Sequence, residues 1–194
     1  MKLHTLLSSS LLVLITANSA QANNFNYNYV ELGYAAINDS EIEGGVIVSG
    51  SYDIKENINI VGDVFVSTSS DSGNVDVDSY RLGVGYHMPL SNQTDVLAEA
   101  GLFNASAEAS GGGITINRDD SGYQLSAGVR HKLAENIELQ GRVNYKNSDD
   151  ISERNYIAGA RYYFNPTLSA GAEFNTGADD GSESITTSLR WNFK

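Results

Sequence analysis

The chain of 194 residues lacks cysteine altogether and contains only two prolines. Without thiols, neither a disulfide framework nor a thiolate metal site can form, so backbone pairing and packing must hold the fold. Long apolar runs are also missing. After the first 22 residues, no segment approaches the roughly 18 consecutive apolar residues that a membrane helix needs. The remaining chain is therefore expected to be either soluble or a barrel that spans a membrane with strands.

Basic residues are scarce, because 12 Lys and Arg stand against 24 Asp and Glu, for a formal net charge of −12. This acidity argues against nucleic acid or an anionic lipid surface as a direct partner. By contrast, glycine is abundant at 19 residues and tyrosine at 11. Helix formers do not recur with a period of 3.6 residues, so composition favours an all-β fold.

The first 22 residues have the features of a secretory signal peptide. Lys2 supplies a positive start, Leu6 to Ile15 form a short apolar stretch, and Ala20-Gln21-Ala22 is a small-x-small cleavage site. The apolar stretch is too short to span a membrane as a helix. We expect cleavage after Ala22 and a single domain over residues 23–194.

Apolar and polar residues alternate with a period of two along the rest of the chain. In the last segment, Ile185, Leu189 and Trp191 share one face while Arg190 lies on the other, which indicates a strand with unlike faces. Ten candidate strands have about the length that a tilted strand needs to cross a bilayer. They are expected near 26–37, 44–54, 57–68, 78–88, 94–105, 121–132, 136–147, 154–164, 167–176 and 183–193.

The predicted connections alternate between short and long. Short ones fall at 55–56, 89–93, 133–136 and 165–166, and long ones at 38–43, 69–77, 106–120, 147–153 and 176–182. This alternation is typical of a transmembrane, antiparallel, up-and-down β-barrel with periplasmic turns and extracellular loops. We predict ten strands. An eight-stranded barrel is the alternative, and it requires two strands to be reassigned as loop.

The charges at membrane depth in the predicted strands share one face, which we assign to the lumen. Six acids and seven bases make up this predicted lumen charge network: Glu31, Asp53, Asp63, Arg81, Glu99, Arg130, Lys132, Glu138, Arg142, Lys146, Arg161, Glu173 and Arg190. A packed salt-bridge network that replaces a hydrophobic core is the favoured interpretation, and a narrow charge-lined pore stays open. Three pairs are expected from the topology, namely Arg130–Glu138, Arg161–Glu173 and Arg190–Glu31.

Aromatic residues of the opposite face gather near both strand ends, as in the two interfacial girdles of a membrane barrel. The predicted girdles consist of Tyr34, Tyr52, Tyr80, Tyr86, Tyr123, Tyr145, Tyr156, Tyr162, Phe164, Phe174, Trp191 and Phe193. The long connections and the strand ends next to them hold 15 acids opposed only by Arg118 and Arg154. A surface bridged by divalent cations is one interpretation of these acids, and solvated loops without a ligand are the favoured one.

Several segments resemble small Gram-negative outer-membrane β-barrels. They are Tyr29–Tyr34, Tyr80–His87, Ala127–Arg130, Ala160–Phe164 and the closing Leu189–Lys194. The chain looks porin-like, with the architecture of OmpX and Opa proteins, and is similar to short Gly/Tyr-rich barrels. The resemblance implies an outer-membrane location, lipid and lipopolysaccharide as partners, and recognition of the C-terminal strand by the barrel-assembly machinery. Lys194 follows Phe193, a departure of one residue from a strand that ends in Phe.

The resulting prediction is a narrow porin-like channel with a charge-lined lumen, in a monomer. The alternative is a structural or surface-interaction barrel, adhesin-like, with acidic loops and no conductance. We expect no enzymatic activity, because His87 and His131 lie near the periplasmic ends and no Asp–His or Ser–His group can be assembled at the extracellular rim. No cofactor, metal site or nucleic-acid partner is expected.

Overall fold

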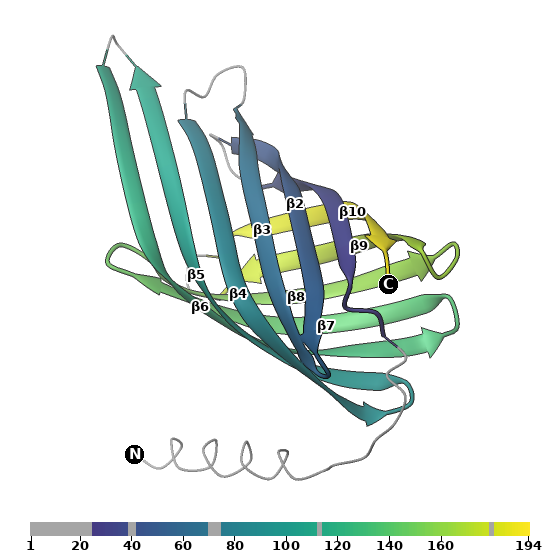
Figure 1. Cartoon of the computed structure of the whole chain (residues 1–194). Helices are drawn as coiled ribbons and strands as arrows, with labels where there is room; N and C mark the ends of the chain where they lie inside the picture. Colours follow the sequence, from purple (N-terminus) through teal and green to yellow (C-terminus); the bar gives the residue numbers. More distant parts are fainter. Residues whose placement is uncertain (1–24, 39–41, 70–74, 112–113, 179–180) are drawn as a thin grey trace, which may run out of the picture.

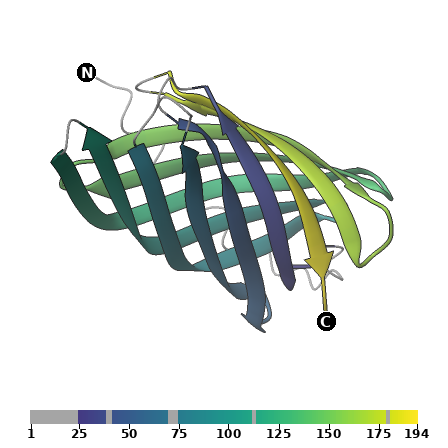
Figure 2. The ribbon, with the colours of Figure 1, turned by 90° about the horizontal axis from the view of Figure 1, so that it is seen from above.

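The computed structural model describes residues 25–38, 42–69, 75–111, 114–178 and 181–194. Ten antiparallel strands form a closed barrel in which each strand pairs with its sequence neighbours and β1 pairs with β10 (Figures 1 and 2). The strands are β1 (Tyr29–Ile37), β2 (Ile42–Lys55), β3 (Ile58–Ser69), β4 (Val75–Ser91), β5 (Thr94–Gly111), β6 (Ile114–Ala134), β7 (Ile137–Ser148), β8 (Ser152–Tyr163), β9 (Leu168–Gly177) and β10 (Glu183–Asn192). The predicted ten-stranded up-and-down barrel is confirmed. The predicted signal peptide lies outside the described residues.

The alternation of the sequence matches the two faces of the barrel wall. On β1, Val30 and Leu32 are 49% and 56% exposed, whereas Glu31 between them is 7% exposed. Apolar groups therefore cover the outside and polar groups the inside, which is the reverse of a soluble globule and suits a wall surrounded by hydrocarbon. In the described part of the chain, no helix is long and apolar enough to cross a membrane.

The two ends of the barrel differ in their connections. At one end, here called the short-turn end, tight turns join β2 to β3, β4 to β5, β6 to β7 and β8 to β9. Asn57 in the first of these turns has a φ of 65°, a left-handed conformation that asparagine tolerates better than most residues. The other five connections lie at the opposite end, here called the long-loop end, and that of β7 to β8 has only three residues, fewer than the predicted 147–153.

One predicted long connection is wrong. Most of residues 106–120 are strand, because β5 and β6 continue as a paired ladder from Ser106↔Asp119 to Gly111↔Ile114. This hairpin reaches farther than the neighbouring strands (Figure 1). A two-stranded extension lets the backbone groups satisfy each other outside the barrel wall, so pairing need not stop where the membrane would end.

The start of β1 also differs from the prediction. The expected first strand began at residue 26, but β1 begins at Tyr29, and residues 25–28 leave the ladder at the short-turn end. These four residues are called the N-terminal segment below. In Figure 1 they form the dark purple stretch that leads into β1.

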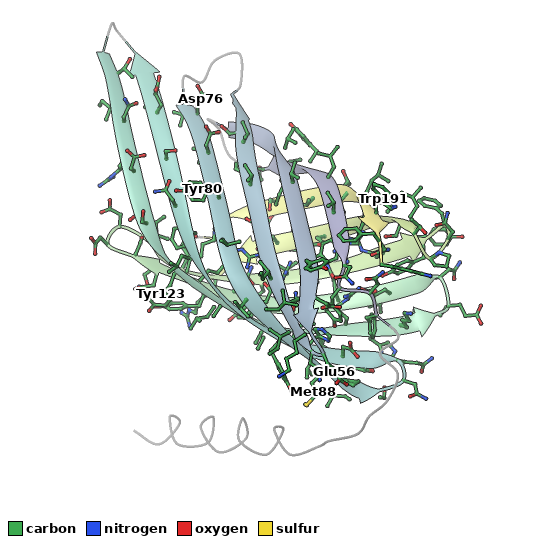
Figure 3. The ribbon with its side chains drawn as sticks, viewed as in Figure 1. Glu56, Asp76, Tyr80, Met88, Tyr123 and Trp191 are labelled. Atoms are coloured by element: carbon green, nitrogen blue, oxygen red, sulfur yellow. The ribbon has the colours of Figure 1, made fainter. Side chains whose placement is uncertain are left out.

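Ten of the twelve predicted girdle residues are more than 40% exposed, and Tyr145 and Phe193 are half-buried. Figure 3 labels three of them, Tyr80, Tyr123 and Trp191, and also Asp76 towards the long-loop end and Glu56 and Met88 at the short-turn end. Tyr162 and Phe164 meet edge-on, with their ring centroids 5.4 Å apart.

Candidate functional site

The inner face of the barrel carries all thirteen charged residues of the predicted lumen network. Their inward direction follows from the register, in which each alternates with outward apolar neighbours. Inward glycines leave space that long side chains of neighbouring strands occupy. A Cβ at Gly171 would lie 2.9 Å from Arg161 Nη2, and one at Gly159 would lie 2.8 Å from Glu173 Cγ. These glycines therefore make room for ionised side chains, not for an empty pore.

Glu31 on β1 joins two arginines across the barrel seam. Arg190 on β10 lies opposite it in the ladder and donates from Nε to Glu31 Oε2, while Arg161 Nη2 on β8 donates to Oε1 at 2.8 Å. All three side chains are at least nine-tenths buried. The predicted Arg190–Glu31 pair is present, and Arg161 adds a contact that sequence reasoning did not find.

Glu138 on β7 centres a second, adjoining group. Arg130 on β6 donates to both carboxylate oxygens at 2.7 and 2.9 Å, and the Tyr163 hydroxyl on β8 donates to Oε2 at 2.7 Å. Glu138 is fully buried and Arg130 is 4% exposed. The predicted Arg130–Glu138 pair is therefore present, with Lys132 directly opposite Glu138 in the ladder and Arg130 on the diagonal. We call Glu31, Arg130, Glu138, Arg161 and Arg190 the buried ion network.

The charges nearer the long-loop end are more open to solvent. Arg81 on β4 bridges Asp63 on β3 at 2.6 Å and Glu99 on β5 at 3.0 Å. These three side chains retain 12–21% exposure. The sequence placed each of them in the lumen, but their grouping depends on the register of two ladders, which turn lengths alone do not define.

The predicted Arg161–Glu173 pair is wrong. In the β8–β9 ladder, Arg161 lies opposite Gly171, and its guanidinium extends over that glycine to Glu31. Glu173 instead accepts a hydrogen bond from Gln140 Nε2 at 2.5 Å and lies 3.7 Å from Arg142 Nη2. Arg142 is thus only loosely paired, with 28% of its side chain exposed.

The short-turn end of the lumen is occupied by the N-terminal segment, which sequence reasoning missed. Tyr27 stacks on His87 with ring centroids 3.6 Å apart, and its hydroxyl donates to Asp95 Oδ2 at 2.9 Å. Burial, only partly offset by Arg130, raises the pKa of the Tyr27 hydroxyl, so the phenol keeps the proton that it donates. Residues 25, 27 and 29 continue the inward parity of β1, and that regularity was the only available signal.

Between these layers and the long-loop end lies a cavity of about 510 Å³. Its lining extends from Tyr27, Glu31 and Arg130 to Val77 and Ile151 near the long-loop end, and includes Arg81, Arg142 and Lys146. Four interior atoms of the described residues, Ser126 Oγ, Asn144 Oδ1, Arg161 Nε and Asn175 Oδ1, are buried without a protein partner. Such atoms favour contact with water or a polar solute.

Acids also gather outside the barrel wall, on the extended parts of β4, β5 and β6. Asp76, Asp78, Glu108 and Asp119 surround a shallow depression there, beside Arg118. Several acids predicted to lie in loops are thus on paired strands. Across residues 25–38, 42–69, 75–111, 114–178 and 181–194, no three His, Cys, Asp or Glu side chains are grouped closely enough to hold a metal ion.

Comparison with known proteins gives the family context of this architecture. Residues 7–164 match the family model described as outer membrane protein beta-barrel domain. No curated protein matches the chain in sequence.

Solved structures of similar shape include two porins. The KdgM porin aligns with a TM-score of 0.52 at 7% identity, over 86% of this chain and 99% of that chain. The NanC porin aligns with a TM-score of 0.52 at 9% identity, over 84% of this chain and 100% of that chain. At such identities, the similarity shows the fold alone.

Proposed function

The chain belongs to the outer membrane protein β-barrel domain family, and from this premise we propose that it is a narrow, porin-like channel for small polar solutes. The family places it in the outer membrane of a Gram-negative bacterium. In such barrels short turns face the periplasm and longer connections face outwards, so the short-turn end is periplasmic.

The observation that carries the proposal is the polar cavity inside a closed wall. Its volume is about 510 Å³, and charged groups from every strand except β2 line it. A barrel that served only as a membrane anchor could fill this space with side chains, as small barrels do. Arg142 and the partnerless Asn144 Oδ1 and Asn175 Oδ1 are instead available to hydrate or contact a passing solute.

Conductance of the purified protein in a planar bilayer tests this function. We expect discrete current steps, and we expect Arg142→Gln to raise the cation-to-anion permeability ratio, because Glu173 then loses its basic neighbour. Arg118→Gln is the matched control, since Arg118 is 73% exposed on the projecting hairpin, away from the cavity. Silence at all voltages, from protein shown to be folded, would contradict the channel.

A second candidate function is surface interaction, as in an adhesin-like barrel. The β5–β6 hairpin favours it, because the hairpin projects beyond the wall and exposes Ile116 to 64% and Arg118 to 73% (Figure 1). Shortening this hairpin would then abolish binding to a target cell while leaving any conductance intact. We propose no catalytic activity for the chain, whose family and porin neighbours are not enzymes.

The expected partners fit either function. We propose that the outward apolar face contacts membrane lipid and lipopolysaccharide, that β10 carries the signal for the barrel-assembly machinery, and that the protein is a monomer.

A further inference from the structure

The N-terminal segment is buried although it belongs to no strand. Phe25 is 6% exposed and Tyr27 is 5% exposed, so both rings are among the most buried apolar side chains of the described residues. Most apolar side chains of the wall face outwards, with Leu32 and Leu82 at 56% and 65% exposure. The interior thus contains few apolar groups, and two of them come from four residues outside the ladder.

The segment reaches across the barrel to the opposite wall. Counted in either direction around the ring, β6 is five strands from β1, to which the segment is attached. Nevertheless, Arg130 of β6 lies over the rings of Phe25 and Tyr27, at 4.8 and 4.9 Å from their centroids. Lys132 of β6 lies 5.3 Å from the Phe25 centroid. Residues 25–28 therefore cross the lumen at its periplasmic end.

The segment fills the part of the cross-section that the buried ion network leaves free. The network comes from β1, β6, β7, β8 and β10. Tyr27 lies instead against His87 of β4 and Asp95 of β5. On these two strands the inward positions Gly83 and Gly101 have no side chains of their own, and the Asn59 amide covers a third inward glycine, Gly85. Removal of the two rings would therefore open a gap between the network and the β4–β5 wall.

The attachments of the segment allow such a displacement. Asn28 is fixed at the rim, because its carbonyl accepts from Phe193 N at 3.0 Å and its side chain accepts from Asp53 N at 2.7 Å. Beyond this anchor, the Asn26 amide donates to the Phe193 carbonyl at 3.0 Å, and the contacts of the rings include stacking, cation–π contacts and the hydrogen bond from Tyr27 to Asp95. Contacts of these kinds are individually weak compared with a continuous strand ladder.

We propose that the N-terminal segment is the periplasmic gate of the lumen. With its rings docked on β4, β5 and β6, the lumen is closed below the cavity. When the segment swings out about Asn28, the cavity becomes continuous with the periplasm. The proposed gate rests on the proposed channel function. Single-channel recording distinguishes a failure of the gate alone from a failure of the channel.

Single-channel recording of Phe25→Ala/Tyr27→Ala tests the gate. We expect open probability to rise about tenfold, which corresponds to about 1.4 kcal/mol, because an aromatic stack and a hydrogen bond together have that size. The matched control is Ile54→Ala/Leu133→Ala, which removes two apolar side chains that are 54% and 60% exposed on the outside of the same end. The control is expected to behave as the unsubstituted protein.

A cross-linked form of the segment provides the second test. Because the chain has no native cysteine, a thiol-specific reagent reacts only with the cysteines that are introduced. In Tyr27→Cys/His87→Cys, a short bis-methanethiosulfonate, which forms a disulfide with each cysteine and releases methanesulfinate, should connect the docked segment to β4. We expect the cross-link to suppress the current and a reducing agent to restore it.

Each outcome decides between the proposals. Equal open probability in the unsubstituted protein and the ring-less variant, or current unaffected by the cross-link, overturns the gate and leaves the channel intact. Silence of all variants, with heat-modifiable folded bands on gels, overturns both. If the ring-less variant does not fold, the cross-linked protein alone gives the decision.

Discussion

At the scale of single residues, Glu31 is the acid on which two buried arginines depend. Arg161 Nη2 lies 2.8 Å from Glu31 Oε1, and Arg190 donates to Oε2. Glu31→Gln leaves both guanidinium groups without their shared counter-charge, and loss of one partner from a buried ion pair costs about 3–5 kcal/mol. We therefore expect the folded band on unboiled gels to disappear at a lower temperature.

The exposed pair Arg118–Asp150 supplies the control for that measurement. Its side chains are 73% and 47% exposed, and ion pairs in water contribute about 0–1 kcal/mol. Asp150→Asn should therefore leave the melting of the folded band nearly unchanged. Equal effects of Glu31→Gln and Asp150→Asn would show that burial adds nothing to the network.

Sequence reasoning found the inward residues, but only some of their partners. Glu31 and Arg190 could be paired because a closed barrel must join its first and last strands. Arg161 and Glu173 were paired wrongly, since the register places Arg161 opposite Gly171 and the arginine extends over that glycine to β1. Because glycine has no side chain, the sequence alone could not indicate that a side chain from a neighbouring strand occupies its space, so this contact could not be predicted.

At the scale of one strand, β4 offers a direct test of which face contacts lipid. Leu82 is 65% exposed on the outer face, and arginine facing lipid costs about 2–4 kcal/mol near the bilayer midplane. We expect Leu82→Arg to reduce assembly of the heat-modifiable form and to lower the urea midpoint of unfolding.

Ser49→Arg is the matched control for Leu82→Arg, because Ser49 lies at the same level but faces the cavity. Ser49 is opposite Asp63, and Asp63 is opposite Arg81, the neighbour of Leu82. A cation there gains an adjacent carboxylate and the water of the cavity. The control should cost less than Leu82→Arg, and the reverse order would contradict the assignment of the faces.

Strand limits were predicted less well than strand faces, for two physical reasons. The hairpin of β5 and β6 continues beyond the expected thickness of the bilayer, because paired backbone groups do not require lipid. The predicted strand lengths were matched to one crossing of a bilayer, and they therefore ended these two strands too early. The N-terminal segment keeps the parity of β1 through Phe25 and Tyr27 while leaving the ladder. A period of two cannot distinguish a paired strand from an extended segment that turns into the lumen.

At the scale of the whole molecule, the interior of the barrel is packed at one end and hollow towards the other. The buried ion network and the N-terminal segment lie at the short-turn end, and the cavity of about 510 Å³ extends from them to the long-loop end. Strand number, closure and wall chemistry could be predicted because each follows from local alternation repeated ten times. The asymmetry between the ends could not, because it depends on side chains that meet across the lumen.

The orientation of the molecule in the outer membrane follows from the same asymmetry and can be measured directly. An epitope tag inserted between β5 and β6 should bind antibody on intact cells, because this hairpin projects at the long-loop end (Figure 1). A tag inserted in the turn between Lys55 and Ile58 should bind only after the outer membrane is permeabilised. Both tags lie between antiparallel neighbours and interrupt no ladder. Labelling of the second tag on intact cells would show that the barrel has the opposite orientation, in which the N-terminal segment faces the exterior instead of the periplasm.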